Sequence, residues 1–345
     1  MGRAGGAAES LVDRLERVAS GDVGRVTFVV GDHSDTTGWN ELHADAVVVA
    51  AQLQQLGVGA GDHVALIGPT SRALVTAIQG VWLAGAVLVT MPLPMRLGRL
   101  DEFVTQTRWR IRQSDSAVVV VDEWLADLLG SDPSDPPFVP LGALCGDDGV
   151  GADDWVRPSL GDDALAVLQF TSGSTASPKA VMLGHRNICA NLDGAWSAAS
   201  LRPDDTMVSW LPLYHDMGLI GLLSIPMTKG CSAVIGAPQD FLPVRSGGFV
   251  GCRSSAGRSP LARTSYALGA RALRRTDEPL DLSSVELLLS GAEPVDPDVF
   301  RSFLEVAAPF GLRPSAAFPA FGMAEVCIAG TFPARGEGLR TDAVH

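Results

Sequence analysis

The chain has 345 residues, 46% of them hydrophobic and 19% charged, which predicts a globular protein of about two lobes. Its net charge of −13 disfavours nucleic acid and anionic membrane surfaces as main partners, although a local loop can still bind a nucleotide. The five cysteines form no CxxC pair, the polar first residues do not resemble a secretory signal and no apolar stretch is long enough to span a membrane, so we expect a cytoplasmic protein without a disulfide scaffold or zinc site.

Strand-like and helix-like segments alternate through the first half of the chain. Strands are predicted at residues 26–30, 64–67, 86–90 and 117–121, and helices at 39–56, 71–83 and 100–111. Asn40 is the candidate N-cap of the first of these helices. The run at 117–121 is apolar throughout, as in a strand that is buried on both faces. This alternation predicts an α/β fold in which mainly parallel sheets are flanked by helices.

Two acidic stretches rich in turn-forming residues, 131–137 and 146–154, predict an exposed connection between two lobes. We therefore expect an N-terminal extension at 1–20, a first α/β lobe at 21–160 and a second α/β lobe at 161–345. In the second lobe, strands are predicted at 165–170, 232–235 and 285–289.

The segment after the apolar run at 165–170 packs five hydroxyl residues, one glycine and one lysine into nine positions, from Thr171 to Lys179. Hydroxyls and backbone N–H groups donate to phosphate oxygens, glycine permits close approach of an anion, and lysine supplies positive charge. The segment therefore predicts a polyphosphate-binding loop, with an ordinary surface turn as the alternative. A P-loop NTPase is disfavoured because Lys179 follows Pro178 and has no adjacent glycine.

Three further motifs follow in chain order. The first, Trp210-Leu-Pro-Leu-Tyr-His-Asp-Met-Gly-Leu-Ile-Gly221, places His215 in a turn bounded by proline and glycine. The second, Leu289-Ser-Gly-Ala-Glu-Pro294, ends an apolar strand, and the third reads Phe318-Pro-Ala-Phe-Gly-Met-Ala-Glu325. Each is more often structural than functional when it stands alone. In this order, together with 171–179, the motifs resemble the acyl-adenylate-forming (AMP-binding) enzymes, most closely fatty acyl-AMP ligases and long-chain fatty acyl-CoA synthetases.

The resemblance implies that the chain binds ATP and Mg²⁺, with catalytic roles for Lys179, His215 and Glu325. The residues implied to hold the triphosphate are Thr171, Ser172, Gly173, Ser174, Thr175 and Lys179. Those implied to hold adenine and the α-phosphate are Gly291, Ala292, Glu293, Phe321, Gly322 and Ala324, with the Phe321 ring stacked on the base. Glu325 is the implied Mg²⁺ ligand, with Thr175 as a second candidate, and His215 is implied to border the reacting carboxylate. Ala324 replaces the threonine of the wider family, which is typical of the fatty acyl-AMP ligase branch.

The implied reaction joins a fatty acid to the α-phosphate of ATP and expels pyrophosphate. The implied acceptor of the acyl group is CoA or an acyl carrier protein, including one of a polyketide synthase. The protein would act mainly by holding the carboxylate in line and by neutralising charge on the phosphates. The apolar segment 217–227 either lines an acyl tunnel or is plain core packing.

Three features depart from the family pattern. Ala176 and Ala180 stand where the loop usually has glycines, so the loop is reshaped unless these sites need no positive φ. At 244–264 the resemblance lapses, because Ser, Gly and Arg make up 12 of the 21 residues without a helical or strand period. We interpret this segment as the product of two compensating frameshifts, which resequencing of the gene would test.

The third departure is at His345, where relatives are expected to continue into a small C-terminal domain with a catalytic lysine. The resemblance therefore implies a truncated chain with weak or no adenylation of its own. The alternative is that the chain is a non-catalytic remnant that binds a nucleotide or an acyl group, or a pseudogene product.

Overall fold

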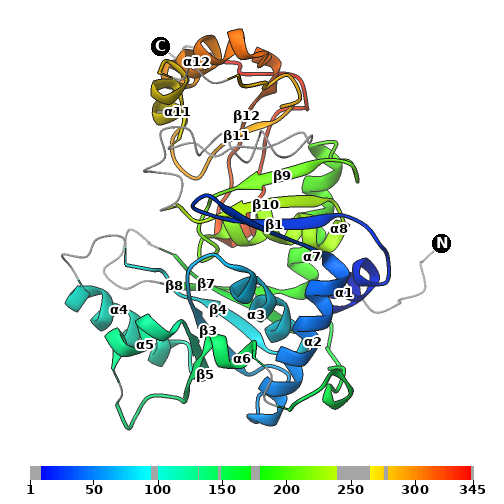
Figure 1. Ribbon diagram of the computed structural model, residues 1–345, viewed down its shortest axis with the longest axis vertical. Helices are drawn as coiled ribbons and strands as arrows, with labels where there is room; N and C mark the ends of the chain where they lie inside the picture. Colours follow the sequence, from blue (N-terminus) through cyan, green and yellow to red (C-terminus); the bar gives the residue numbers. More distant parts are fainter. Residues whose placement is uncertain are drawn as a thin grey trace. The chain divides into compact units, whose positions relative to one another are not determined.

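The computed structural model of the chain describes residues 9–94, 100–130, 132–146, 149–171, 179–238, 265–275 and 279–342. They belong to two compact units, which Figure 1 draws in the colours of the sequence. Unit 1 comprises Met1–Asp22, Trp39–Ala190 and Leu213–His215, and unit 2 comprises Val23–Gly38, Asn191–Pro212 and Asp216–His345. The segment 244–264, interpreted above as a frameshift product, lies outside the described residues.

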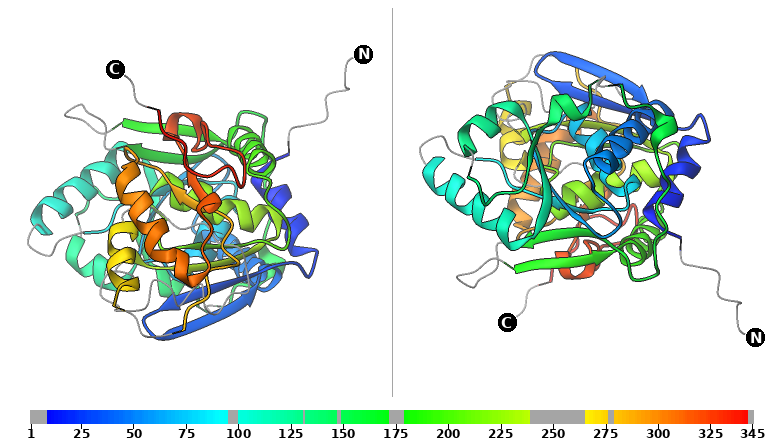
Figure 2. Two further views of the ribbon diagram at one scale, coloured as in Figure 1. Left: turned by 90° about the horizontal axis from the view of Figure 1, so that it is seen from above. Right: turned by 90° about the horizontal axis from the view of Figure 1, so that it is seen from below.

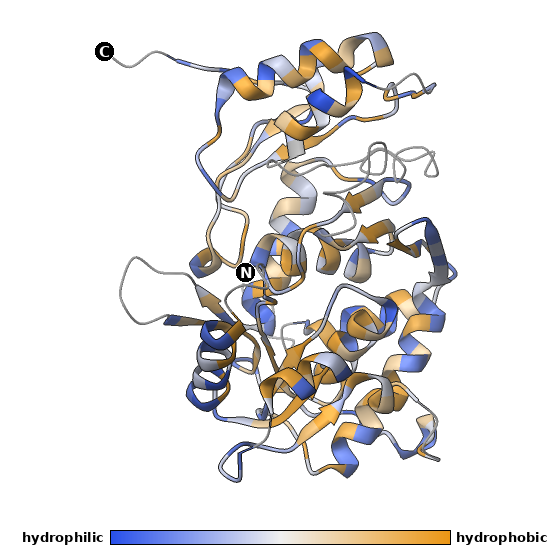
Figure 3. Cartoon of the chain, turned by 60° about the vertical axis from the view of Figure 1, so that its left-hand side comes forward, coloured by the Kyte–Doolittle hydropathy of each residue, from blue (hydrophilic) through white to orange (hydrophobic). Residues whose placement is uncertain are grey.

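Unit 1 is built on a six-stranded sheet with the strand order β6-β5-β3-β4-β7-β8. Its strands are β3 (His63–Ile67), β4 (Val87–Thr90), β5 (Ser116–Val121), β6 (Phe138–Pro140), β7 (Leu165–Thr171) and β8 (Lys179–Gly184). Neighbouring strands pair in parallel except β7 and β8, which pair antiparallel. The central strands are almost entirely buried and strongly hydrophobic (Figure 3), as a parallel sheet covered on both faces requires.

Helices lie on both faces of this sheet (Figures 1 and 2). On one face α4 (Leu100–Gln113) and α5 (Glu123–Leu129) share a core with alternate residues of β3, β4 and β5. On the other face lie α2 (Trp39–Gln55) and α3 (Arg72–Leu83), where Trp82 Nε1 donates to the carbonyl oxygen of Ala166 on β7 at 2.9 Å. The remaining helices of unit 1 are α1 (Leu11–Ala19), α6 (Leu141–Leu144), the 3₁₀ helix η2 (Ala152–Asp154) and the beginning of α7 (His185–Ala198).

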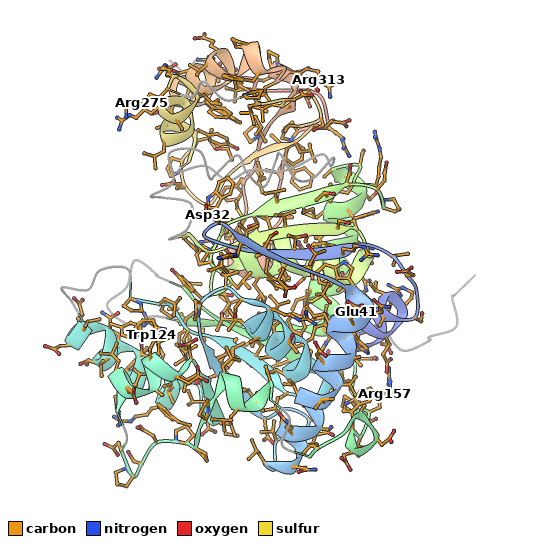
Figure 4. The ribbon with its side chains drawn as sticks, in the orientation of Figure 1. Asp32, Glu41, Trp124, Arg157, Arg275 and Arg313 are labelled. Carbon is orange, nitrogen blue, oxygen red and sulfur yellow. The ribbon has the colours of Figure 1, made fainter. Side chains whose placement is uncertain are left out.

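The N-terminal helix α1 is a packed part of unit 1. Ser10 begins it with a capping box, in which the Asp13 N–H donates to Ser10 Oγ and the Ser10 N–H donates to Asp13 Oδ2. Leu11 and other residues of α1 are buried. Arg157, labelled in Figure 4, forms ion pairs with Asp13 at 2.6 Å and with Glu16 at 2.8 Å. Residues 11–19 therefore form a helix that packs within unit 1, whereas we expected an N-terminal extension at 1–20.

His185 is buried at the start of α7, where its Nδ1 accepts a hydrogen bond from the Leu11 N–H at 3.3 Å. Burial lowers the pKa of His185 from 6.5 to about 4, although the nearby Asp13 carboxylate acts in the opposite direction. Between these two pH values the unfolded chain binds a proton at this site that the folded chain excludes. The contribution of His185 to the stability of the folded state is therefore complete above pH 6.5, and it is lost as the pH falls toward 4.

We expect His185→Asn to remove this pH dependence, because the asparagine oxygen can still accept from Leu11 but takes up no proton. The wild-type chain should lose about 3 kcal/mol more of its unfolding free energy between pH 7 and pH 4 than the variant does. Urea unfolding at a series of pH values measures the difference, with His33→Asn at an exposed site as control. Equal pH profiles for the wild type and His185→Asn would contradict the expectation.

Unit 2 contains a four-stranded sheet with the strand order β2-β1-β10-β9 and a separate pair, β11-β12. The strands are β1 (Arg25–Val30), β2 (His33–Gly38), β9 (Thr206–Ser209), β10 (Ser232–Gly236), β11 (Leu288–Ser290) and β12 (Ala317–Pro319). All pairs are parallel except β1 with β2. Together the two units confirm the predicted α/β class with mainly parallel sheets.

The helices of unit 2 are the rest of α7, α8 (Ile225–Lys229), α11 (Ser265–Leu273), α12 (Pro297–Ala307), the π-helix η3 (Met217–Ser224) and three 3₁₀ turns, η5 (Ala308–Phe310), η6 (Pro314–Ala316) and η7 (Ala324–Val326). An aromatic cluster joins α11 to α12, because the ring of Tyr266 stacks on Phe300 at 4.6 Å between centroids and tilts against Phe303. Within the described residues, no helix is both long and apolar enough to cross a membrane.

Two further expectations differ from the structure. The chain does not divide near residue 160, because β7 pairs with β4 and so belongs to unit 1, while the predicted strand at 26–30 forms β1 but pairs with β10 in unit 2. The helix predicted at 39–56 forms, but Asn40 is not its N-cap. Strand β2 runs to Gly38 and α2 begins directly at Trp39, so that Asn40 lies inside the first turn.

Candidate functional site

The predicted phosphate loop is closed by the β7–β8 hairpin of unit 1. Thr171 and Lys179 are paired across the two strands, and the Thr171 hydroxyl donates to the Lys179 carbonyl at 3.4 Å. The Lys179 side chain is exposed at the base of the loop. Four predicted residues, Ser172, Gly173, Ser174 and Thr175, lie outside the described residues. The structure thus sets the two ends of the loop beside each other.

Ala180 needs none of the conformational freedom of the glycine that it replaces. It pairs with Phe170 in the antiparallel ladder and is absent from the described residues with positive φ. An extended strand position accepts any L-residue, so alanine adds no strain there. Of the two departures predicted to reshape the loop, this one has no such effect, and Ala176 lies outside the described residues.

Gln169 connects the phosphate-loop strand to the segment that carries His215. It is a buried residue of β7, two positions before Thr171, and its Nε2 donates to the carbonyl oxygen of Tyr214 at 2.8 Å. The next residue, His215, is exposed. Burial raises the pKa of Tyr214, which keeps its phenol protonated at neutral pH. The structure therefore ties the predicted carboxylate-bordering histidine to the strand that leads into the loop, both within unit 1.

The two motifs of unit 2 that are predicted to bind adenine follow neighbouring parallel strands. Leu289 on β11 is in register with Phe318 on β12, and the Ala320 N–H extends the pairing by donating to the Ser290 carbonyl at 2.7 Å. The carboxyl ends of both strands therefore meet at one edge, which brings Gly291, Ala292 and Glu293 to the same place as Phe321. Edges of this kind are the usual ligand-binding location of parallel sheets.

Close backbone contact at this edge explains the glycine of the first motif. A β-carbon on Gly291 would lie 2.8 Å from the Ala320 carbonyl oxygen, so a larger residue would push the two motifs apart. Ala292 next to it has a φ of 69°, which is rare for alanine and marks a tightly held turn. The Tyr266 hydroxyl donates to the Leu289 carbonyl at 2.6 Å and fixes β11 from the aromatic cluster.

The third motif forms a closed loop between Phe321 and Thr331. These two residues exchange backbone hydrogen bonds of 2.8 and 2.9 Å. Gly322 lies so close to the Ile328 carbonyl that a β-carbon would overlap its oxygen. Within the loop Ala324 is buried and Glu325 is exposed, in the short turn η7. The Phe321 side chain is 61% exposed, so its ring is accessible to a planar ligand.

Glu325 has the chemistry of a magnesium ligand. Carboxylate oxygens are preferred by Mg²⁺, which usually binds one or two protein carboxylates and takes its other ligands from substrate phosphates and water. The part of the chain that the structure describes contains no group of three His, Cys, Asp or Glu residues suited to a metal ion. A single exposed carboxylate such as Glu325 is compatible with this pattern of coordination, so its role as the magnesium ligand stays a prediction.

Two supporting residues, Gln169 and Tyr266, were missed in the sequence. Gln169 gave one signal, since it is the only polar residue in the run 165–170. A buried amide in an apolar strand needs a hydrogen-bond partner, although its identity follows only from the fold. Tyr266 gave no signal of its own, because its partner Leu289 is 23 residues away.

Known proteins resemble this chain over most of its length. The model of the AMP-binding enzyme family matches residues 15–343. A putative ligase of Mycobacterium tuberculosis is 36% identical over 332 residues, which cover 89% of this chain and 56% of that protein. A long-chain-fatty-acid–AMP ligase of Mycobacterium marinum is 33% identical over 323 residues, with coverages of 89% and 54%.

A similar solved structure is that of a fatty acyl-adenylate ligase from L. pneumophila in complex with acyl adenylate and pyrophosphate. It superposes with a TM-score of 0.84 at 27% identity and covers 95% of this chain and 58% of that chain. The chain therefore spans a little over half the length of these relatives.

Proposed function

Because the chain belongs to the AMP-binding enzyme family, we propose that it binds ATP and serves to activate a fatty acid as an acyl-adenylate. The observation that carries this proposal is the parallel pairing of β11 with β12, which gathers the motifs at 291–293 and 321–325 at one sheet edge. The names of the relatives support a fatty acid as the substrate. CoA or an acyl carrier protein remains the proposed acceptor of the acyl group.

In the proposed reaction a carboxylate oxygen of the fatty acid attacks the α-phosphorus of ATP. A bond forms between that oxygen and phosphorus, the bond from phosphorus to the bridging oxygen breaks, and pyrophosphate leaves. We propose that Lys179 neutralises charge on the departing phosphates, that the hydroxyls at 171–175 donate hydrogen bonds to them, and that His215 borders the carboxylate. Such a site works by alignment and by charge stabilisation rather than by covalent chemistry of its own.

Within this proposal the Phe321 ring stacks on adenine, and the backbone at Gly291 and Gly322 permits close approach of the nucleotide. Glu325 is the residue that would hold Mg²⁺, with Thr175 as the second candidate. The bound ion would supply positive charge to the phosphate oxygens. Glu325 itself would orient that charge from the loop between Phe321 and Thr331.

Binding is a sharper test than turnover, because the chain spans a little over half the length of its relatives. We expect Lys179→Ala and Glu325→Ala each to raise the Kd for ATP with Mg²⁺ by about ten-fold or more, since each removes one charge-assisted contact. Isothermal titration calorimetry measures both changes.

The chain offers matched controls for both variants. Lys229 is the only other lysine, and it pairs with Asp193 and lies over the Trp196 ring in unit 2. Glu305 is an exposed glutamate on α12. Lys229→Ala and Glu305→Ala should leave the Kd unchanged. If the Kd for ATP stayed unchanged in both Lys179→Ala and Glu325→Ala, the site assignment would be wrong. The ATP site would then have to lie elsewhere.

A further inference from the structure

We infer that Asn191 is a positioning residue that holds the Glu325 loop in the form that presents this carboxylate to a magnesium–nucleotide complex. Asn191 lies on α7, 135 residues before Val326, and unit 2 contains both Asn191 and the loop. The inference rests on the proposed function and adds a residue that none of the motifs contains.

The side chain of Asn191 makes three hydrogen bonds to the backbone just after Glu325. Its Nδ2 donates to the carbonyl oxygens of Val326 at 2.9 Å and Ala329 at 3.0 Å. Its Oδ1 accepts from the Ala329 N–H at 3.2 Å. Both amide hydrogens are thereby used on main-chain carbonyls, so the side chain acts on the loop and not directly on a ligand.

The loop needs this support because its backbone is under local strain. Cys327, between the two anchored carbonyls, has a φ of 71°, a conformation that non-glycine residues adopt only when their surroundings enforce it. On the other side of the loop, Gly322 lies directly against the Ile328 carbonyl. Asn191 thus holds the backbone after Glu325, and the close contact at Gly322 holds the backbone before it. The turn η7 with Glu325 lies between these two points.

The chemistry of the contact requires an amide. Leucine has a similar volume but neither donates nor accepts, so it would leave the Val326 and Ala329 carbonyls without these bonds. Aspartate could still accept from the Ala329 N–H, but its carboxylate would face the two carbonyl oxygens and repel them. We therefore expect both replacements to release the loop, with aspartate at least as harmful as leucine.

The test compares ATP affinity with Mg²⁺ and with EDTA, because a merely structural residue would change both alike. Calorimetry on the full chain gives the Mg²⁺-dependent gain in affinity for the wild type, Glu325→Ala, Asn191→Leu and Asn191→Asp. We expect Glu325→Ala to abolish the gain and both Asn191 variants to reduce it about ten-fold, as for residues that orient a metal ligand. Affinity in EDTA should stay within about two-fold of the wild type, since the phosphate loop and adenine edge remain intact.

Asn187→Ala is the matched control, since Asn187 lies one turn earlier on α7 and its Oδ1 accepts from the Gly184 N–H at 3.3 Å, outside the loop that carries Glu325. It should keep the full Mg²⁺-dependent gain. Should Asn191→Leu fail to fold in thermal unfolding, Asn191→Ser, which retains one donor, is the second variant, with an intermediate loss expected.

The outcomes separate this inference from the proposed function. A full Mg²⁺-dependent gain in every folded Asn191 variant, together with its loss in Glu325→Ala, would overturn the role of Asn191 alone. No gain in the wild type, or an unchanged gain in Glu325→Ala, would instead overturn the assignment of Glu325 as the magnesium ligand, which belongs to the proposed function.

Discussion

Gly322→Ala is expected to disrupt the loop between Phe321 and Thr331 and to abolish ATP binding. An added β-carbon would overlap the Ile328 carbonyl oxygen and lie 2.8 Å from its carbonyl carbon. Both obstacles are backbone atoms of Ile328, within the loop that the Phe321–Thr331 hydrogen bonds close, so no side chain can rotate away to make room. We expect a loss of about 3 kcal/mol or more of unfolding free energy. Urea unfolding measures this loss, and calorimetry measures the accompanying loss of ATP affinity.

Gly194→Ala is the control for this prediction. Gly194 lies on α7 in the same unit, and nothing outside its own helix stands within 4 Å of the position that a β-carbon would take. Because alanine favours the helical conformation, this variant should be neutral or more stable by up to about 1 kcal/mol. A Gly322→Ala protein with wild-type stability and affinity would show that the loop can move, contrary to the geometry described above.

Arg335→Met should cost unit 2 about 3–5 kcal/mol, the usual effect of removing one partner of a buried ion pair. The Arg335 side chain is 8% exposed and forms two hydrogen bonds to Asp205, which is 2% exposed. It also bonds Glu286 at 2.9 Å and the Ser200 carbonyl at 2.7 Å. Burial lowers the pKa of Arg335, but the two carboxylates outweigh it and leave the pKa raised. Without the guanidinium, the Asp205 carboxylate would stay buried without its counter-charge.

Arg340→Met provides the comparison for an exposed ion pair. The Arg340 side chain is 80% exposed and lies 2.9 Å from Glu337. Because water screens such a pair, its loss should cost less than about 1 kcal/mol. Chemical denaturation monitored by circular dichroism measures both variants. If the two substitutions lowered the unfolding free energy equally, the buried ion pairs of Arg335 would stabilise unit 2 no more than an exposed pair does. Arg313, labelled in Figure 4, lies 3.9 Å from Glu286, which is too far for a hydrogen bond, so Arg313 cannot replace Arg335.

Much of the fold could be predicted from local patterns. The apolar runs at 64–67, 86–90 and 117–121 are central strands, because uninterrupted burial leaves a clear sequence signature. Strand β2 was not predicted, since its first four residues are exposed and polar. The boundary between the units could not be predicted either. It depends on which strands pair, and local patterns do not show that β1 pairs with β10 or that β7 pairs with β4.

In the candidate site, too, some residues could be predicted from the sequence and others could not. The motif residues, among them Lys179 and Glu325, stand out because their types and spacing are unusual. Their supports could not be predicted, because each is an ordinary polar residue whose partner is a backbone group on another segment. Gln169 and its partner Tyr214 are 45 residues apart, and Asn191 and Val326 are 135 residues apart. A backbone carbonyl leaves no mark in the amino-acid sequence, so only the fold identifies these pairs.

The pairing of β1 with β10 has a consequence for synthesis. Val26 and Phe28 on β1 become buried in a sheet in which β1 pairs with β10. The paired residues of β10, Ala233–Ile235, are synthesised about 200 residues later. At ribosomal rates of about 5–20 residues per second, that delay is roughly 10–40 seconds. During translation the β1–β2 hairpin therefore presents an open apolar edge, which makes the nascent chain a candidate client for chaperones. Slower translation past Gly38 should increase aggregation of the newly made protein.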